Sequence, residues 1–235
     1  VWGQRHSTVD YKRPAEQLDW MLGQGVSVSM YMFHGGTNFW YMNGANTAGG
    51  YRPQPTSYDY DAPLGEWGNC YPKYYAFREV IQKHLPHGTV LPEVPADNPT
   101  TTFATIELKE SASLQAAFHQ TTESENVLSM EDLGVDFGYI HYQTTINKAG
   151  KQKLIIQDLR DYAVILVDGK QVASLDRRYN QNNVMLDIQK APATLEILVE
   201  NTGRVNYGPD ILFNRKGITN QVLCGDEKLT GWSIT

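Results

Sequence analysis

The chain has 235 residues, of which 41% are hydrophobic and 20% charged, and its formal net charge is −6. These values are typical of a globular protein with one large or two modest domains, and they exclude an intrinsically disordered chain. The sequence has no apolar run long enough to span a membrane and no basic cluster, so we expect neither a membrane span nor a nucleic-acid partner.

The two cysteines, Cys70 and Cys224, lie far apart in the sequence and outside any spacing typical of a metal site. We interpret them as free or buried thiols, with a long-range disulfide as the alternative in an oxidising compartment. The sequence begins at Val1 with neither an initiator Met nor a signal peptide. We therefore expect it to be part of a longer protein.

The first predicted element is a helix over residues 11–24. Leu18, Met21 and Leu22 recur at spacings of three and four, which places them on one face of a helix. Gly23 follows this stripe and is a typical helix end.

Residues 26–33 alternate between two faces and predict a β-strand. One face is aliphatic, and the other carries small polar residues followed by Tyr31 near the strand's C-terminal end. In a parallel α/β barrel the C-terminal ends of strands carry the chemistry. Tyr31 is therefore a candidate site residue.

Residues 34–70 form a long glycine-rich loop that is also rich in aromatic residues, which predicts a functional loop rather than disorder. A second helix is expected over 72–85, with Pro72 in its first turn. The order helix, strand, long loop and helix is typical of the end of an α/β barrel.

Prolines punctuate residues 86–100, and the pattern beyond them changes to short alternating runs typical of β-strands. Asp168-Gly169 lies between two such runs and predicts a hairpin. The expected strands are 102–108, 137–147, 152–157, 162–167, 171–175, 183–188, 194–199 and 230–235.

The sequence thus predicts the C-terminal part of a barrel in residues 1–88, a linker in 89–100 and a β-sandwich or jelly-roll domain in 101–235. One strand and two helices leave both strand edges unpaired, and a complete barrel takes roughly 250 residues. We therefore expect a missing N-terminal barrel segment, or a partner chain, to complete the first part.

Four stretches of the sequence resemble glycoside hydrolase family 35 β-galactosidases of the lysosomal acid type. They are Gly35-Gly36-Thr37-Asn38-Phe39, Tyr58-Asp59-Tyr60-Asp61-Ala62-Pro63-Leu64, the run Tyr71–Arg78 and the run Val199–Gly208. Together these stretches extend the resemblance over nearly the whole chain.

The resemblance implies a TIM (β/α)8 barrel followed by a jelly-roll β-sandwich of the galactose-binding type. It also implies a retaining mechanism with two glutamates roughly 5 Å apart. Both glutamates lie upstream of these motifs in the family, so we expect no catalytic residue within this chain. The resemblance implies no cofactor or metal, and a lysosomal location with secretion as the alternative.

The resemblance places a galactose-binding tyrosine at Tyr60, and we expect Tyr60 and Tyr31 to contact a β-galactoside substrate. If the run around Tyr60 is extended, Tyr58 points the opposite way and packs. Asp59 and Asp61 would then point the same way, at a separation that loosely matches an inverting pair. We prefer a structural role for them, since short carboxylates in loops cap backbone N–H groups.

Other residues of these motifs have plainer interpretations. His34 lacks metal-ligand partners in the sequence, so we expect it to fix the loop by a hydrogen bond. Trp40 and Tyr41 either stack on a sugar or, as is commoner for loop aromatics, pack. Arg204 and Tyr207 are expected to pack the β domain, with packing against the barrel as a further interpretation.

The leading hypothesis is part of a retaining exo-β-galactosidase acting on glycans and glycolipids. The alternative is a non-catalytic carbohydrate-binding protein in which the β domain holds the sugar. A third interpretation is a structural β domain that supports a homodimer or a larger complex.

Overall fold

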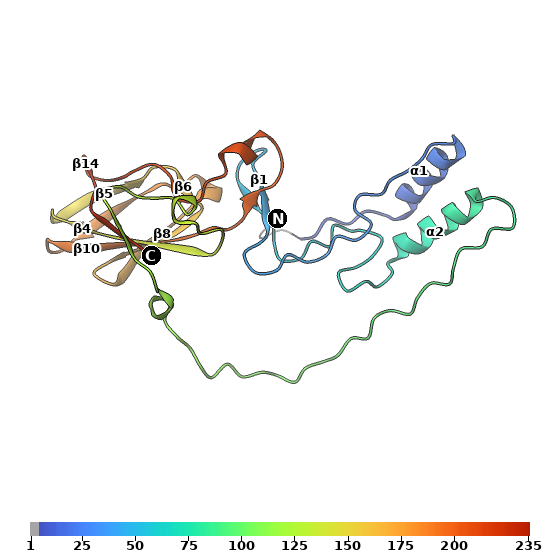
Figure 1. Ribbon diagram of the computed structural model, residues 1–235, viewed down its shortest axis with the longest axis horizontal. Helices are drawn as coiled ribbons and strands as arrows, with labels where there is room; N and C mark the ends of the chain where they lie inside the picture. Colours follow the sequence, from blue (N-terminus) through green and yellow to red (C-terminus); the bar gives the residue numbers. More distant parts are fainter. Residues whose placement is uncertain (1–4) are drawn as a thin grey trace. The chain divides into compact units, whose positions relative to one another are not determined.

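The structure, a computed structural model that describes residues 5–235, divides into two compact units (Figure 1). The first unit consists of the residues up to Phe39 together with Pro55–Leu108, and the second of Trp40–Gln54 together with Lys109–Thr235. Residues 40–54 therefore group with the β-rich part, although they lie within the first part along the sequence. The domain boundaries at 88 and 100 remain a prediction.

Two α-helices lie side by side in the first unit (Figure 1). The helix α1 (Lys12–Gly23) and the helix α2 (Pro72–His84) confirm the two helices expected from the sequence, and Pro72 occupies the first turn of α2. Asp19 of α1 joins the pair by accepting from Lys83, at 2.6 Å, and from His84 of α2.

The strand expected over residues 26–33 is not formed, so this prediction is wrong. Residues 26–30 have no regular structure, and the nearest β contact is an isolated bridge between His34 and Leu64. A strand needs a partner for its backbone N–H and C=O groups, and within residues 5–235 no strand pairs with this segment, although the carbonyl of Phe33 at its end accepts from the N–H of Leu64 at 3.1 Å. Its side chains are accordingly exposed, Tyr31 at 85% among them.

The larger sheet of the second unit is antiparallel and, within residues 5–235, has six strands. Their spatial order is β3 (Thr122–Ser124), β15 (Trp232–Ile234), β4 (Tyr139–Ile146), β10 (Ala193–Glu200), β7 (Tyr162–Val167) and β8 (Lys170–Asp176).

The smaller antiparallel sheet contains, in the described part of the chain, β14 (Glu227–Lys228), β13 (Val222–Cys224), β5 (Gly150–Ile156) and β9 (Asn183–Ile188). Shorter pairings join β6 (Leu159–Arg160) to β12 (Gly217–Ile218), and β1 (Gly44–Asn46) to both β11 (Arg204–Val205) and β2 (Arg52–Pro53). The described part of the chain also contains four short 3-10 helices: η1 (Leu114–Ala117), η2 (Glu131–Leu133), η3 (Arg177–Tyr179) and η4 (Pro209–Phe213).

One hydrophobic core joins the two sheets of the second unit. Ile197, at the centre of β10, lies opposite Tyr142 of β4 on one side and Ile165 of β7 on the other, and all three are fully buried. From the smaller sheet, Leu154 and Leu186 belong to the same core. The strict alternation of buried residues along β10 is what period-2 packing requires.

The β-strands predicted beyond residue 130 are all present, but the expected strand 102–108 is wrong. Residues 102–108 have no regular structure and are exposed. The hairpin at Asp168-Gly169 is confirmed, because both residues have positive φ, 49° and 75°, as a type I′ turn between twisted strands requires. Cys70 and Cys224 are free thiols, as preferred.

The first unit buries little apolar surface. Within the described residues, Ala15 and Leu18 are the buried residues of α1, and α2 has none. Trp20, Val26 and Phe39 are all exposed. This thin core agrees with the expectation that the first part of the chain needs further chain to cover it.

We predict that residues 1–88 made alone do not fold cooperatively. Their few buried side chains cannot offset the conformational entropy of ordering the segment, and the removal of the second unit strips residues 40–54 of their partners. Thermal unfolding followed by near-UV circular dichroism provides the measurement. A sharp, reversible transition would contradict the prediction, and the intact chain serves as the control.

Candidate functional site

Two of the motifs singled out in the sequence meet at Gly35. A Cβ atom at this position would lie 1.8 Å from the carbonyl oxygen of Tyr58 and 2.7 Å from that of Asp59. Contacts below 3.0 Å to backbone atoms are not tolerated, so only glycine lets the two stretches approach this closely.

The two stretches continue to pair on either side of this contact. The carbonyl oxygen of Gly36 accepts from the N–H of Tyr58 at 3.0 Å, and the N–H of Asn38 donates to the carbonyl of Thr56 at 2.7 Å. Thr37 and Ser57 form an isolated antiparallel bridge. Backbone hydrogen bonds thus fix the register of one motif on the other.

A carboxylate that the sequence analysis did not single out completes this pairing. Thr37 Oγ1 and Ser57 Oγ each donate to one oxygen of Glu66, both at 2.8 Å. A lone Glu in a loop gives no sequence signal of this role, because its partners are 29 and 9 residues away. Glu66 therefore acts as a bridge between the motifs.

Three tyrosines gather beside this pairing. Tyr60 has a φ of 61° and turns the chain, so the rings of Tyr58 and Tyr60 lie with their centroids 5.2 Å apart. The expectation that Tyr58 points away from Tyr60 is therefore wrong; residues two apart lie on the same face of an extended run as well, so an extended run would not have separated the two rings either. Tyr60 is 61% exposed and Tyr31 is 85% exposed.

The environment keeps the phenol of Tyr58 neutral. Burial raises the pKa of Tyr58, and the neighbouring Tyr31 and Tyr60 hydroxyls raise it further. A neutral phenol both donates and accepts hydrogen bonds. The cluster of Tyr31, Tyr58 and Tyr60 therefore offers flat apolar faces and hydroxyl groups, which together suit a sugar ring with its hydroxyls.

Asp59 and Asp61 do not form an acid/base pair in this structure. Asp59 accepts from the backbone N–H of Asp61 and from the hydroxyl of Tyr71, both at 3.0 Å. Asp61 accepts from Lys73 Nζ at 2.7 Å and from the backbone N–H of Val9 at 3.0 Å. The preferred structural role for both carboxylates is confirmed.

The plainer interpretations of two further residues of the motifs are also confirmed. His34 Nε2 donates to the carbonyl of Glu66 at 3.3 Å and so fixes the loop. Tyr41 packs edge-on against Tyr139 at a centroid distance of 5.5 Å. Trp40, by contrast, is 84% exposed.

Of the two residues expected to pack the β domain, one does so and the other is exposed. Arg204 donates to Glu131 Oε1 at 2.6 Å and to the carbonyl oxygens of Asp136 and Asn214, which confirms its role. Tyr207 is 75% exposed, so the expectation for it is wrong. Its neighbour Gly208 has a φ of 87°, in the region that favours glycine.

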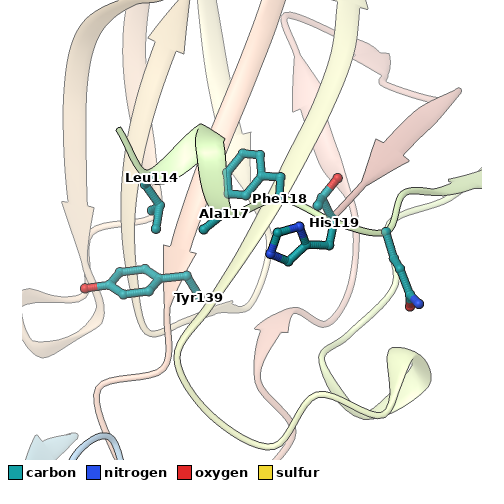
Figure 2. Close-up of a pocket in the computed structure, with 7 residues that line it drawn as sticks. Leu114, Ala117, Phe118, His119 and Tyr139 are labelled. Atoms are coloured by element: carbon teal, nitrogen blue, oxygen red, sulfur yellow. The ribbon is translucent and has the colours of Figure 1, made fainter. Parts of the chain in front are cut away.

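Figure 2 shows a separate hollow of about 340 Å³ on the second unit. Leu114, Ala117 and Phe118 line it from η1 and its end, and Tyr139 of β4 lies opposite. His119 contributes a polar edge.

Within residues 5–235, no group of three or more acidic, His or Cys side chains is placed to hold a metal ion. None of the described helices is long and apolar enough to cross a membrane.

Comparison of the sequence with known protein families identifies the family of this chain. Residues 1–84 match the family described as Glycosyl hydrolases family 35, and residues 127–235 match that described as Beta-galactosidase, first all-beta domain. The chain belongs to glycoside hydrolase family 35. Both tyrosine-bearing motifs of the site lie in the first of these regions.

Curated relatives extend the match over nearly the whole chain. A beta-galactosidase of Xanthomonas manihotis is 41% identical over 98% of this chain, and that of Mus musculus is 41% identical over 99%. The Homo sapiens beta-galactosidase is 38% identical over 99%. The chain spans only 39%, 36% and 35% of the lengths of these three relatives.

A solved structure, a GH2 beta-galacturonidase from Eisenbergiella tayi, also matches. The match covers 49% of this chain and 24% of the chain in that structure, at 20% sequence identity and with a TM-score of 0.31. A score of this size supports no argument about the fold.

We predict that Gly35→Ala separates the two site motifs. The added methyl group would collide with the backbone carbonyl of Tyr58, which no side-chain rearrangement can relieve. Limited proteolysis should then cut within residues 34–70 much faster than in the original chain. Gly23→Ala is the matched control, because a Cβ there meets only His84, at an ordinary 3.7 Å, and an equal cleavage rate in both variants would contradict the prediction.

Proposed function

We propose that this chain is part of a retaining exo-β-galactosidase that removes terminal non-reducing β-D-galactose from glycans and glycolipids. The family match and the beta-galactosidase relatives support the proposal. The observation that carries it within the structure is the exposed tyrosine cluster, which backbone contacts at Gly35 hold beside the paired motifs.

In this proposal Tyr60 and Tyr31 form part of the wall that holds galactose. The phenol of Tyr60 hydrogen-bonds a sugar hydroxyl, and the faces of the cluster cover the apolar side of the ring. The two catalytic glutamates of the retaining mechanism come from residues outside these 235, and Asp59 and Asp61 are engaged in local structure. The galactoside is the substrate, and no cofactor enters the reaction.

The proposal includes the finer architecture. The first unit is the C-terminal end of a TIM barrel, completed by an N-terminal segment, and the second is a jelly-roll β-sandwich. The match of residues 1–84 to the hydrolase family and the two antiparallel sheets with one core support these assignments. A lysosomal location, with secretion as the alternative, rests on the resemblance to the mammalian enzymes.

We predict that Tyr60→Phe weakens galactoside hydrolysis in the full-length enzyme by about 1–3 kcal/mol of transition-state stabilisation. The change removes one hydroxyl and leaves its sugar partner unpaired, while the ring and its contact with Tyr58 remain. Steady-state kinetics on a β-galactoside, with galactose inhibition, gives the measurement. Tyr75→Phe, on the exposed side of α2, is the control, and unchanged kinetics in Tyr60→Phe would remove that residue from the site.

The hollow between η1 and β4 favours the second candidate, a carbohydrate-binding β unit. Phe118 and Tyr139 provide aromatic surface, and His119, Gln120 and Thr235 provide polar edges. Sugar-binding sites combine such surfaces. However, Phe118 already stacks on His141 at 4.8 Å, so part of its face is occupied.

We therefore expect galactose not to bind at this hollow. Titration calorimetry should use the full-length enzyme rather than residues 100–235, because that fragment would lack the segment 40–54 that belongs to the second unit. Phe118→Ala should leave the heat of galactose binding unchanged, whereas Tyr60→Phe should reduce it. The reverse pattern would support the carbohydrate-binding alternative, and Val172→Ala, exposed on β8, is the control.

A further inference from the structure

Residues 40–54 are built into the second unit through their backbone. Within this segment, β1 pairs in parallel with β11, so that Gly44 lies opposite Arg204 and Ala45 opposite Val205. Asn43 Nδ2 donates to the carbonyl of Thr202 at 2.7 Å. The segment therefore forms part of a sheet and is more than a surface loop.

Two glycines permit this close fit. A Cβ on Gly44 would lie 2.4 Å from Nδ2 of Asn206, and one on Gly203 would lie 2.6 Å from the carbonyl oxygen of Gly44. Gly203 also has a φ of 152°, in the region that favours glycine. The sequence thus keeps side chains out of the contact between 40–54 and the β unit.

Tyr51 inserts from this segment into a buried polar network. Its side chain is almost fully buried, at 6% exposure. Its hydroxyl lies 2.9 Å from Asp161 Oδ2 and 2.6 Å from the carbonyl oxygen of Gly203, and it accepts from Lys216 Nζ at 3.3 Å. Lys216 also donates to Asp161 Oδ2 at 2.6 Å, so the hydroxyl completes a charged cluster.

The network is paired on every side. Arg177 donates to the second oxygen of Asp161 at 2.8 Å, and its guanidinium lies 4.3 Å from the centre of the Tyr51 ring. Burial lowers the pKa of Lys216 to about 8, although Asp161 opposes the shift. Lys216 therefore remains charged at neutral and acidic pH.

Along the chain, both ends of 40–54 lead directly into the site motifs. Asn38 precedes the segment and Pro55 follows it, and Asn38 Nδ2 donates to the carbonyl of Pro55 at 3.0 Å. The N–H of Asn38 donates to Thr56 in addition. The base of the loop is therefore closed, and few residues separate the held segment from the tyrosine-bearing motifs.

We infer that Tyr51 is a positioning residue for the galactoside site, because it fixes residues 40–54, the segment that joins the two site motifs along the chain. The inference rests on the proposed function. It makes substrate binding depend on a segment whose own contacts lie in the second unit.

The test is the KM of the full-length enzyme for a β-galactoside. Tyr51→Phe removes the hydroxyl from the network and keeps the ring, so kcat/KM should fall by about 10- to 100-fold, the scale that small misplacements cost, with a clear rise in KM. KM does not depend on the fraction of enzyme that is folded, so a loss of stability alone would lower the maximal rate and leave KM unchanged.

Tyr142→Phe is the matched control. Tyr142 is also a fully buried tyrosine of the β unit, and its hydroxyl donates to Leu128 and accepts from Ile218. It lies outside the network, so its loss should reduce stability and leave KM unchanged. If Tyr51→Phe gives too little folded enzyme, Asn43→Ala tests the same segment through its contact with Thr202.

The outcomes separate the two proposals. A raised KM in Tyr51→Phe or Asn43→Ala, with none in Tyr142→Phe, supports the inference. An unchanged KM in both variants, while Tyr60→Phe lowers kcat/KM, overturns the inference and leaves the proposed function standing. An unchanged kcat/KM in Tyr60→Phe as well overturns the site itself and the inference with it.

Discussion

The buried ion pair between Lys216 and Asp161 is the contact on which the organisation of the second unit depends. Both side chains are almost inaccessible, at 0% and 2% exposure. Removal of one partner from such a pair typically costs about 3–5 kcal/mol, because the other charge remains buried. Tyr51 and Arg177 contribute further hydrogen bonds to Asp161, and Tyr51 thereby connects a segment near the start of the chain to a residue 110 positions later.

Much of the second unit could be predicted from the sequence. The runs that became β4, β7 and β10 alternate between apolar and polar residues, and such a pattern acts over neighbouring residues that the sequence displays directly. Residues 26–33 show an equally clear alternation, yet no strand forms there. The alternation shows which face of a strand would be buried. Whether a partner is present for the strand's hydrogen bonds depends on residues that are far away in the sequence.

The candidate site was predictable in its residues more than in its geometry. The motifs around Gly35 and Tyr60 could be recognised, but the left-handed turn at Tyr60 could not, since non-glycine residues seldom adopt it. The roles of Glu66 and Tyr51 could not be predicted from the sequence, for another reason. Each is a common residue in a loop, and its role comes from partners that only the folded chain brings near.

The position of Tyr51 has a consequence for the order in which the protein matures. Tyr51 and Lys216 are separated by 165 residues, and a chain leaves the ribosome at roughly 5–20 residues per second. Residues 40–54 therefore emerge many seconds before the strands that receive them. During that interval their apolar and polar groups lack native partners, and so distant a closure is intrinsically slow. A nascent chain of this kind leaves such groups unpaired for longer than one whose domains follow each other in sequence.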